Sequence, residues 1–247
     1  PFAVARLYER TTRLLDSLIV SLGEQPVADL AEARIGSPLS FEMEALKVRV
    51  NYHDLSCVYF ADRISRQMPG VENCRILEIG GGYGAMASKL KLLNPSSQIV
   101  LIDLPESSAF QHYYLSRKFP DATVLTAADL VADPGALESG WDFLILPNTR
   151  TELASGLSFD LALNVRSFME MTPETIAFYC AWFGRALAPG GICYLANRPE
   201  KQIGQDLIRF DDYPIPANWT LQSEEVVPAQ THILERVYRS VRPGDRA

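Results

Sequence analysis

Residues 76–84 read Ile-Leu-Glu-Ile-Gly-Gly-Gly-Tyr-Gly, and this stretch decides the fold. Residues 74–79 have the length and apolar character of a buried strand, and a helical pattern follows over residues 84–93. Glycines between a strand and a helix let the backbone turn tightly and approach a ligand closely. The first amides of the helix add a positively polarised end. The stretch therefore predicts a strand, a ligand-binding turn and a helix.

Two acidic residues flank this turn. Glu78 stands two positions before Gly80, and Asp103 ends the next predicted strand, where a carboxylate can accept the hydroxyls of a ribose. Gly80, Gly82 and Ala85 also satisfy the loose G-x-G-x-x-A pattern of dinucleotide sites. The Glu78 carboxylate would repel a phosphate group placed beside it. The turn therefore favours a ligand other than a dinucleotide.

Residues 78–84 resemble the (Asp/Glu)-x-Gly-x-Gly-x-Gly motif of the class I methyltransferases that use S-adenosylmethionine (SAM). In that family the acid, here Glu78, helps hold the amino-acid end of SAM. Residues 158–171 (SFDLALNVRSFMEM) resemble the family's segment near the reacting methyl group, and Ala-Pro-Gly-Gly at 188–191 also resembles these enzymes. The resemblance covers residues 74–196, about half the chain. It implies SAM as the cofactor and S-adenosylhomocysteine as its product.

A narrower resemblance extends over more of the chain. Several segments are similar to the sugar O-methyltransferases of bacterial glycan and natural-product gene clusters. These segments are LEIGGGYG (77–84), IDLPE (102–106), YYLSRKFP (113–120), SFDLALNVRSFMEM (158–171), RIGSP (34–38) and Asn-Arg (197–198). The resemblance implies a sugar or a glycosylated natural product as the methyl acceptor.

The pattern of apolar residues changes along the chain. Helical patterns cover residues 2–22 and about 50–67, with no convincing buried strand between them. Strands and helices alternate afterwards, which predicts βαβ units, and the last two predicted strands fit an antiparallel pair. We therefore expect an α/β, Rossmann-like class I methyltransferase fold with a mostly parallel seven-stranded sheet and helices on both faces. Residues 1–70 are expected to form an N-terminal helical cap that binds the acceptor, and residues 71–247 the SAM-binding domain.

The cofactor contacts are predicted from the turn and from the ends of the following strands. The adenine ring is expected beside the loop after the third strand, for which residues 128–130 and 147–149 compete. We favour 147–149 because FLIL at 143–146 has the composition of a buried strand, although a turn-forming role for the Asn of that loop remains open. The predicted cofactor contacts are Glu78, Gly80, Gly81, Gly82, Asp103, Leu104, Asn148 and Asn164.

Methyl transfer to a hydroxyl benefits from a base that removes the hydroxyl proton. Glu170 lies in the loop after the fourth predicted strand, beside the expected position of the methyl group, and Arg166 in the same loop is suited to orienting an acceptor. His53 lies on the cap and titrates near neutral pH. Arg198 follows the fifth strand and is suited to lining the acceptor pocket. Glu170, His53 and Arg166 are the predicted catalytic residues, and a surface role is the alternative for each.

Composition limits the partners. The net charge is −7 and the pI about 5.1, with no basic stripe, so nucleic acid is not an expected substrate. No apolar run reaches the roughly 18 residues of a membrane span, and no cleavable signal pattern is present at the N-terminus. No clustered carboxylates of the kind a divalent cation needs are evident, so no metal site is predicted. Four cysteines without metal-ligand spacing predict buried free thiols and a cytoplasmic protein: Cys57, Cys74, Cys180 and Cys193.

The sequence thus predicts a SAM-dependent methyltransferase that acts on a small-molecule hydroxyl, with a homodimer as one compatible assembly. Three alternatives stay open. The first is methylation of a nitrogen or carbon atom of a small metabolite instead of a hydroxyl. The second is a protein that binds SAM without catalysis, and the third is a nicotinamide-dependent oxidoreductase. Glu78 argues against the last of these.

Overall fold

A computed structural model of the 247-residue chain describes residues 2–31, 35–36, 38–43, 47–68, 73–228 and 230–241. The N-terminal part contains α1 (Phe2–Leu22), α2 (Glu24–Ala31), β1 (Phe41–Met43), β2 (Val48–Val50) and α3 (Tyr52–Gln67). The α/β part begins with β3 (Arg75–Ile79), α4 (Ala85–Leu93), β4 (Gln98–Asp103), α5 (Pro105–Lys118), β5 (Val124–Thr126), α6 (Ala127–Ala132) and β6 (Phe143–Pro147). It continues with β7 (Phe159–Val165), α7 (Pro173–Ala186), β8 (Leu187–Asn197), β9 (Glu200–Ile203), β10 (Asp206–Arg209), β11 (Trp219–Val226) and β12 (Leu234–Ser240). Four short 3₁₀ helices complete the described elements: Ala136–Glu138, Asn148–Ala154, Phe168–Glu170 and Phe210–Asp212.

The central sheet has the strand order β11-β12-β8-β7-β3-β4-β6-β5 within the described residues. The strands from β8 to β5 are parallel, whereas β12 runs antiparallel to β8 and β11 antiparallel to β12. The expected antiparallel pair at one edge is therefore confirmed. The expected number of seven strands is wrong, because the three half-buried residues of β5 pair with the outer side of β6 and add an eighth strand at the edge.

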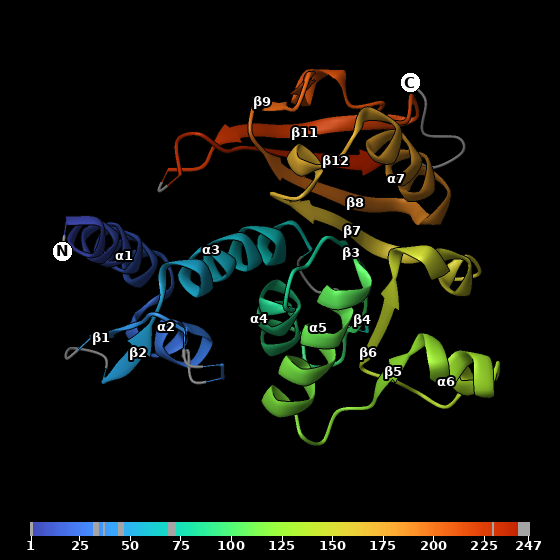
Figure 1. Cartoon of the computed structure of the whole chain (residues 1–247), viewed down its shortest axis with the longest axis horizontal. Coiled ribbons are helices and arrows are strands. Elements are labelled where there is room, and N and C mark those ends of the chain that lie inside the picture. Colours follow the sequence, from blue (N-terminus) through green and yellow to red (C-terminus); the bar gives the residue numbers. More distant parts are fainter. Residues whose placement is uncertain are drawn as a thin grey trace.

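The sheet buries apolar side chains on both faces. Leu77 of β3 packs in one cluster with Phe183 of α7, and Ile76 packs in a second cluster with Phe60 of α3. Successive strand residues point to opposite faces, so Glu78 lies on the same face as Ile76. Helices α4 and α5 lie over β3 and β4 in Figure 1. The helical layer therefore covers the face to which Glu78 points.

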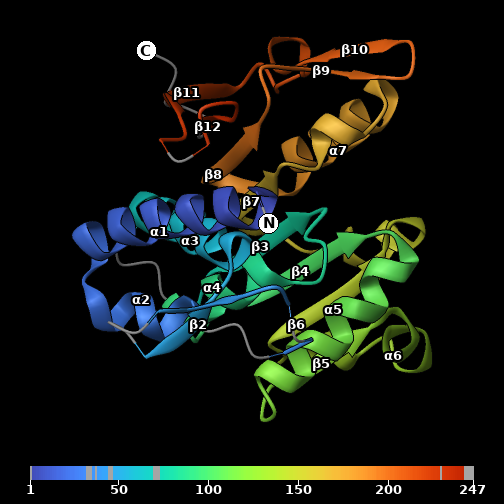
Figure 2. The ribbon, with the colours of Figure 1, turned by 60° about the vertical axis from the view of Figure 1, so that its left-hand side comes forward.

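The N-terminal helices form a small core of their own beside α4 (Figure 2). Leu18 of α1, Val27 of α2 and Leu55 of α3 belong to this cluster, together with the antiparallel β1–β2 hairpin. The opposite side of α3 packs in the sheet cluster, so α3 joins the cap to the sheet. The predicted helix over 2–22 is confirmed, and α3 begins at 52 because the Asn51 side chain caps it. The predicted domain boundary at residue 70 lies outside the described residues.

Two ion pairs, one of them fully buried, fix α3 in place. Lys89 of α4 lies 2.8 Å from Asp54 of α3, and both side chains are buried. Arg63 of α3 lies 2.7 Å from the buried Glu235 of β12, which also accepts a hydrogen bond from Tyr194 of β8. Removing one partner of a buried pair leaves an uncompensated charge, which costs about 3–5 kcal/mol. The cap is therefore held against both α4 and the far side of the sheet.

All four cysteines are buried and free, which confirms the predicted thiols. In the described part of the chain, no helix is both long enough and apolar enough to cross a membrane.

Candidate functional site

The turn after β3 depends on backbone conformations that favour glycine. Gly80, Gly82 and Gly84 have φ of +73°, +58° and +93°, in the left-handed region that side chains disfavour. The Gly80 N–H donates to the carbonyl of Ile102 in β4 at 2.8 Å, which ties the turn to the neighbouring strand. The turn is therefore rigidly placed at the carboxyl edge of the sheet.

The glycines of this turn have different surroundings. A Cβ at Gly80 would lie 1.9 Å from Ser167 Oγ, and one at Gly81 would lie 2.8 Å from the carboxyl carbon of Glu78. At Gly82, by contrast, nothing lies within 4 Å of the position of a Cβ. Contacts within the protein thus account for two glycines, and Gly82 faces open space.

Glu78 is the most unusual charged group of the site. Its side chain is 2% exposed, and one carboxylate oxygen has no hydrogen-bond partner among the described residues. Burial, with a smaller contribution from nearby Asp103, raises the pKa of Glu78 from 4.5 to about 8. Glu78 also lines a pocket of about 370 Å³ at the turn. Its carboxylate oxygen without a partner could therefore accept a hydrogen bond from a ligand in that pocket.

Asp103 lies on the other side of the turn. Its carboxylate accepts the N–H of Gly82 at 2.8 Å and the N–H of Leu104 at 2.7 Å. Asp103 pairs with Pro147 across β4 and β6, so the loops that begin at Leu104 and Asn148 start side by side. The loop next to Asp103 is therefore the one after residue 147, as favoured from the sequence, because β5 and residues 128–130 lie one strand further away.

Asn164 at the end of β7 is fully buried and bound on all sides. Its amide nitrogen donates to the Ile79 carbonyl at 2.9 Å and to Ser167, and its oxygen accepts from the N–H of Phe168 and from Asn197. These contacts hold the loop after β7 against the glycine turn. The Asn164 side chain therefore joins the two loops, and its contact with a cofactor stays a prediction.

The three predicted catalytic residues come together. Glu170, His53 and Arg166 all line the pocket that contains Glu78, with the glycine turn beside them. They come from two regions of the sequence more than 100 residues apart, the N-terminus of α3 and the loop after β7. Arg198 and His232, from beyond β8 and before β12, line the same pocket.

The contacts of Arg166 fix the state of His53. The Arg166 backbone is left-handed (φ +63°), and its guanidinium lies 3.0 Å from Gln230 Oε1 and 3.3 Å from His53 Nδ1. A guanidinium can only donate, so Nδ1 must accept and the ring proton must lie on Nε2. Burial, followed by the charge of Arg166, lowers the pKa of His53. His53 is therefore held neutral, with its Nε2–H beside the sulfur of Cys57 at 3.8 Å.

Glu170 lies in the short helix Phe168–Glu170 at the mouth of the pocket. Its side chain is 62% exposed, and its carboxylate lies 2.9 Å from Lys201 Nζ of β9. No described group of three His, Cys, Asp or Glu side chains is arranged to hold a metal ion.

Sequence reasoning missed several residues that shape the site. Ser167 fills the space over Gly80, and buried Gln230 joins Arg166 to Ser56 of α3, to whose hydroxyl it donates at 2.8 Å. Lys201 and His232 were also missed. Ser167 lies in the segment 158–171 that resembles the methyltransferases. No motif near Gln230 in the sequence indicates a role at the site. Its partners are distant in the chain, and only the fold brings them together.

No protein-family model matches the sequence, and no curated protein matches it. The structure is similar to N-methyltransferase NodS from Bradyrhizobium japonicum in complex with S-adenosylhomocysteine, with a TM-score of 0.51 and 15% identity over 76% of this chain and 87% of NodS. The chain therefore shares its fold with this methyltransferase.

Two further solved structures agree on this fold. TrmN from Thermus thermophilus aligns with a TM-score of 0.50 and 16% identity, over 74% of this chain and 49% of TrmN. A predicted O-methyltransferase from Nostoc punctiforme aligns with a TM-score of 0.51 and 12% identity, over 76% of this chain and 58% of that protein. The part of this chain that aligns with TrmN thus covers about half of the length of TrmN. The narrower resemblance to sugar O-methyltransferases stays a prediction.

Proposed function

We propose that the protein is a SAM-dependent methyltransferase that methylates a hydroxyl of a small molecule, a sugar or a glycosylated natural product. The unpartnered oxygen of buried Glu78, beside the open space at Gly82, carries this proposal. A buried carboxylate gains most from a cationic donor, and the amino-acid end of SAM has an ammonium group. A dinucleotide would bring a phosphate to the same place, where ionised Glu78 would repel it and protonated Glu78 would supply no countercharge.

The residues present fit SAM at both ends of the turn. We expect Glu78, which lines the pocket, to receive the ammonium group, and Asp103 at the end of β4 to receive ribose hydroxyls. Leu104 and Asn148, at the starts of adjacent loops, are placed to flank the adenine. When bound, SAM supplies the activated methyl carbon. The crystal structure of NodS contains S-adenosylhomocysteine, and the shared fold supports the same cofactor here.

The other side of the pocket suits an acceptor rich in oxygen. Arg166, Arg198, His53 and His232 line it, and each can donate hydrogen bonds to hydroxyl or ring oxygens. His53 contacts Arg166 through Nδ1 and Cys57 through Nε2, so we propose that it acts by holding the Arg166 guanidinium toward the acceptor. In the proposed reaction a C–O bond forms as the C–S bond breaks, and the hydroxyl proton passes to Glu170. Arg166 and His53 orient the acceptor.

The test is a methylation panel with the purified full chain. SAM is mixed with free sugars, glycosides, simple phenols and amines, and S-adenosylhomocysteine is measured by chromatography and mass spectrometry. We expect turnover with glycosides and a mass gain of one methyl group on a hydroxyl. Turnover with amines alone would replace O-methylation by N-methylation. SAM binding without turnover on any acceptor would instead favour a binding protein without catalysis.

A further inference from the structure

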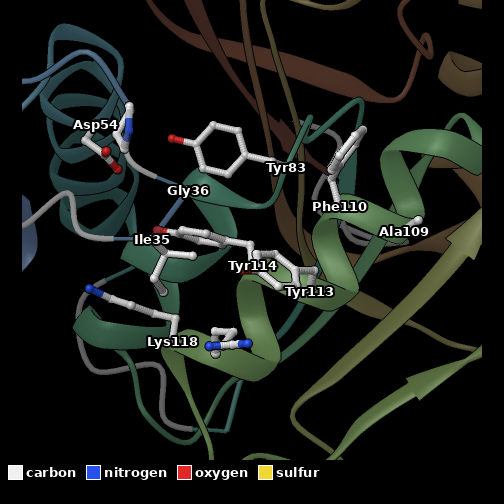
Figure 3. A pocket seen from close by; sticks show the side chains of 11 residues that line it. Ile35, Gly36, Asp54, Tyr83, Ala109, Phe110, Tyr113, Tyr114 and Lys118 are labelled. Carbon is white, nitrogen blue, oxygen red and sulfur yellow. The ribbon is translucent and has the colours of Figure 1, made fainter.

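A second, larger pocket of about 840 Å³ lies beside the cofactor pocket (Figure 3). The outer face of α5 forms one wall of this pocket. The opposite wall comes from the cap, through Ile35, Gly36 and Pro38. Pockets for small molecules usually measure roughly 300–1,000 Å³ and are mainly apolar with a few polar groups. This pocket has the size of a small-molecule site, and none of the three predicted catalytic residues lines it.

Aromatic side chains dominate the lining. Tyr83, Phe110, Tyr113 and Tyr114 surround the space in Figure 3. Phe110 is 64% exposed and Tyr113 is 51% exposed, whereas Tyr114 is buried and anchors the wall through Ser88. Exposed aromatic side chains gathered around a cavity mark a surface that a ligand covers. Their flat faces suit another ring or an apolar chain.

Among the charged side chains that line this pocket, the two basic ones are accessible to solvent, and the acidic one is buried. Arg117 lies over the ring of Tyr113, with 5.3 Å between the guanidinium carbon and the ring centroid, and Lys118 follows it at the end of α5. The acid of the lining, Asp54, is buried and paired with Lys89 at 2.8 Å. The pocket therefore tolerates an anionic or electron-rich substituent at its Arg117 end.

The two pockets share a wall. His53 lines the cofactor pocket and Tyr83 the aromatic pocket, and their ring centroids are 5.5 Å apart. Tyr83 stands between Gly82 and Gly84, so the binding turn itself contributes to the aromatic pocket. Tyr83 also contacts Tyr114 edge-on, with 4.9 Å between centroids. A ligand in the aromatic pocket would lie directly beside the proposed site of methyl transfer.

We propose that this pocket holds the aromatic or apolar aglycone of the acceptor while its sugar lies in the cofactor pocket. The inference rests on the proposed function. It makes the acceptor an aryl or alkyl glycoside larger than a free sugar, and it gives Phe110, Tyr113 and Arg117 the role of selecting the aglycone.

Dye binding tests the pocket independently of methyl transfer. The aromatic anion 1-anilinonaphthalene-8-sulfonate is titrated into the full chain, and its fluorescence is followed. We expect one saturable site. The affinity should fall at least tenfold in Phe110→Ala, which removes a ring, and in Ala109→Trp, which fills the space. Phe178→Ala removes a ring that is 48% exposed from α7, outside both pockets, and should leave dye affinity unchanged. SAM affinity should be unchanged in all three variants.

Competition identifies the occupant. 4-Nitrophenyl glycosides should displace the dye, and the corresponding methyl glycosides should not. Equal dye binding by wild type, Phe110→Ala and Ala109→Trp would overturn the inference, as would the absence of displacement by any aryl glycoside. So would a dimer in the wild type that Phe110→Ala converts to a monomer, because the pocket would then be an interface between copies. Failure of SAM to bind would refute the proposed function while leaving the dye result intact.

Discussion

Replacing Glu78 with Gln should remove a pH-dependent cost of folding. In the unfolded chain this carboxyl group ionises with its ordinary pKa of 4.5, whereas burial and Asp103 raise its pKa in the folded protein to about 8. The folded state therefore holds the proton more tightly, so Glu78 lowers stability increasingly as pH rises from 4.5 to 8. At 1.36 kcal/mol for each tenfold change, the cost is about 2 kcal/mol at pH 6 and about 4 kcal/mol at pH 8.

Urea unfolding at pH 6 and pH 8 measures this directly. The free energy of unfolding of Glu78→Gln minus that of the wild type should increase by about 2 kcal/mol between the two pH values. A buried amide without partners lowers the stability of the variant at both pH values, so the change with pH is the decisive quantity. Glu138→Gln, an exposed site outside both pockets, serves as control and should show no such change. A difference that is constant with pH would refute the account of Glu78 as a buried, unpaired acid.

Three further predictions concern the site. Gly82→Asp should abolish SAM binding, measured by calorimetry, because it fills open space at φ +58°, whereas Gly204→Asp, at φ +57° with similarly open surroundings, should bind SAM normally. Glu170→Gln should lower kcat at least tenfold with SAM affinity unchanged, and loss of affinity without loss of kcat would remove Glu170 as the base. Gln230→Leu should lower kcat/KM about tenfold, because it removes the hydrogen bond to Arg166. Gln230→Glu keeps an acceptor for Arg166 and should retain more activity. Equal losses of kcat/KM in the two variants would mean that Gln230 has a purely structural role.

The local parts of the site could be predicted from the sequence. The turn at 80–84 needs glycine whatever its surroundings, and Glu78 and Asp103 lie at fixed distances from it along two adjacent strands. The ends of neighbouring parallel strands meet at one edge of the sheet. Hence the positions of Glu170 and Arg166 at the pocket followed from their place after β7.

Contacts between distant segments could not be predicted in this way. Gln230 reaches Ser56 across 174 residues, and no local pattern marks either residue. The hydrogen bonds of Asn164 to Ile79 and Phe168 also depend on how two loops meet in the fold, which no local pattern shows. The eighth strand, β5, has three half-buried residues and no alternation of burial, so its pairing depends on β6 beside it. The sequence permits a short strand at residues 123–126, but a pattern over so few residues does not establish its place in the sheet.

The most direct test of the central claim is calorimetric titration of the full chain with SAM and, separately, with NAD. At pH 6.5 Glu78 is almost fully protonated, and pairing with the ammonium group of SAM would ionise it. We predict that SAM binds with release of about one proton, seen as a dependence of the binding heat on the ionisation enthalpy of the buffer, and that NAD does not bind. Binding of NAD without binding of SAM would contradict the account, and SAM binding without proton release would contradict the role given to Glu78.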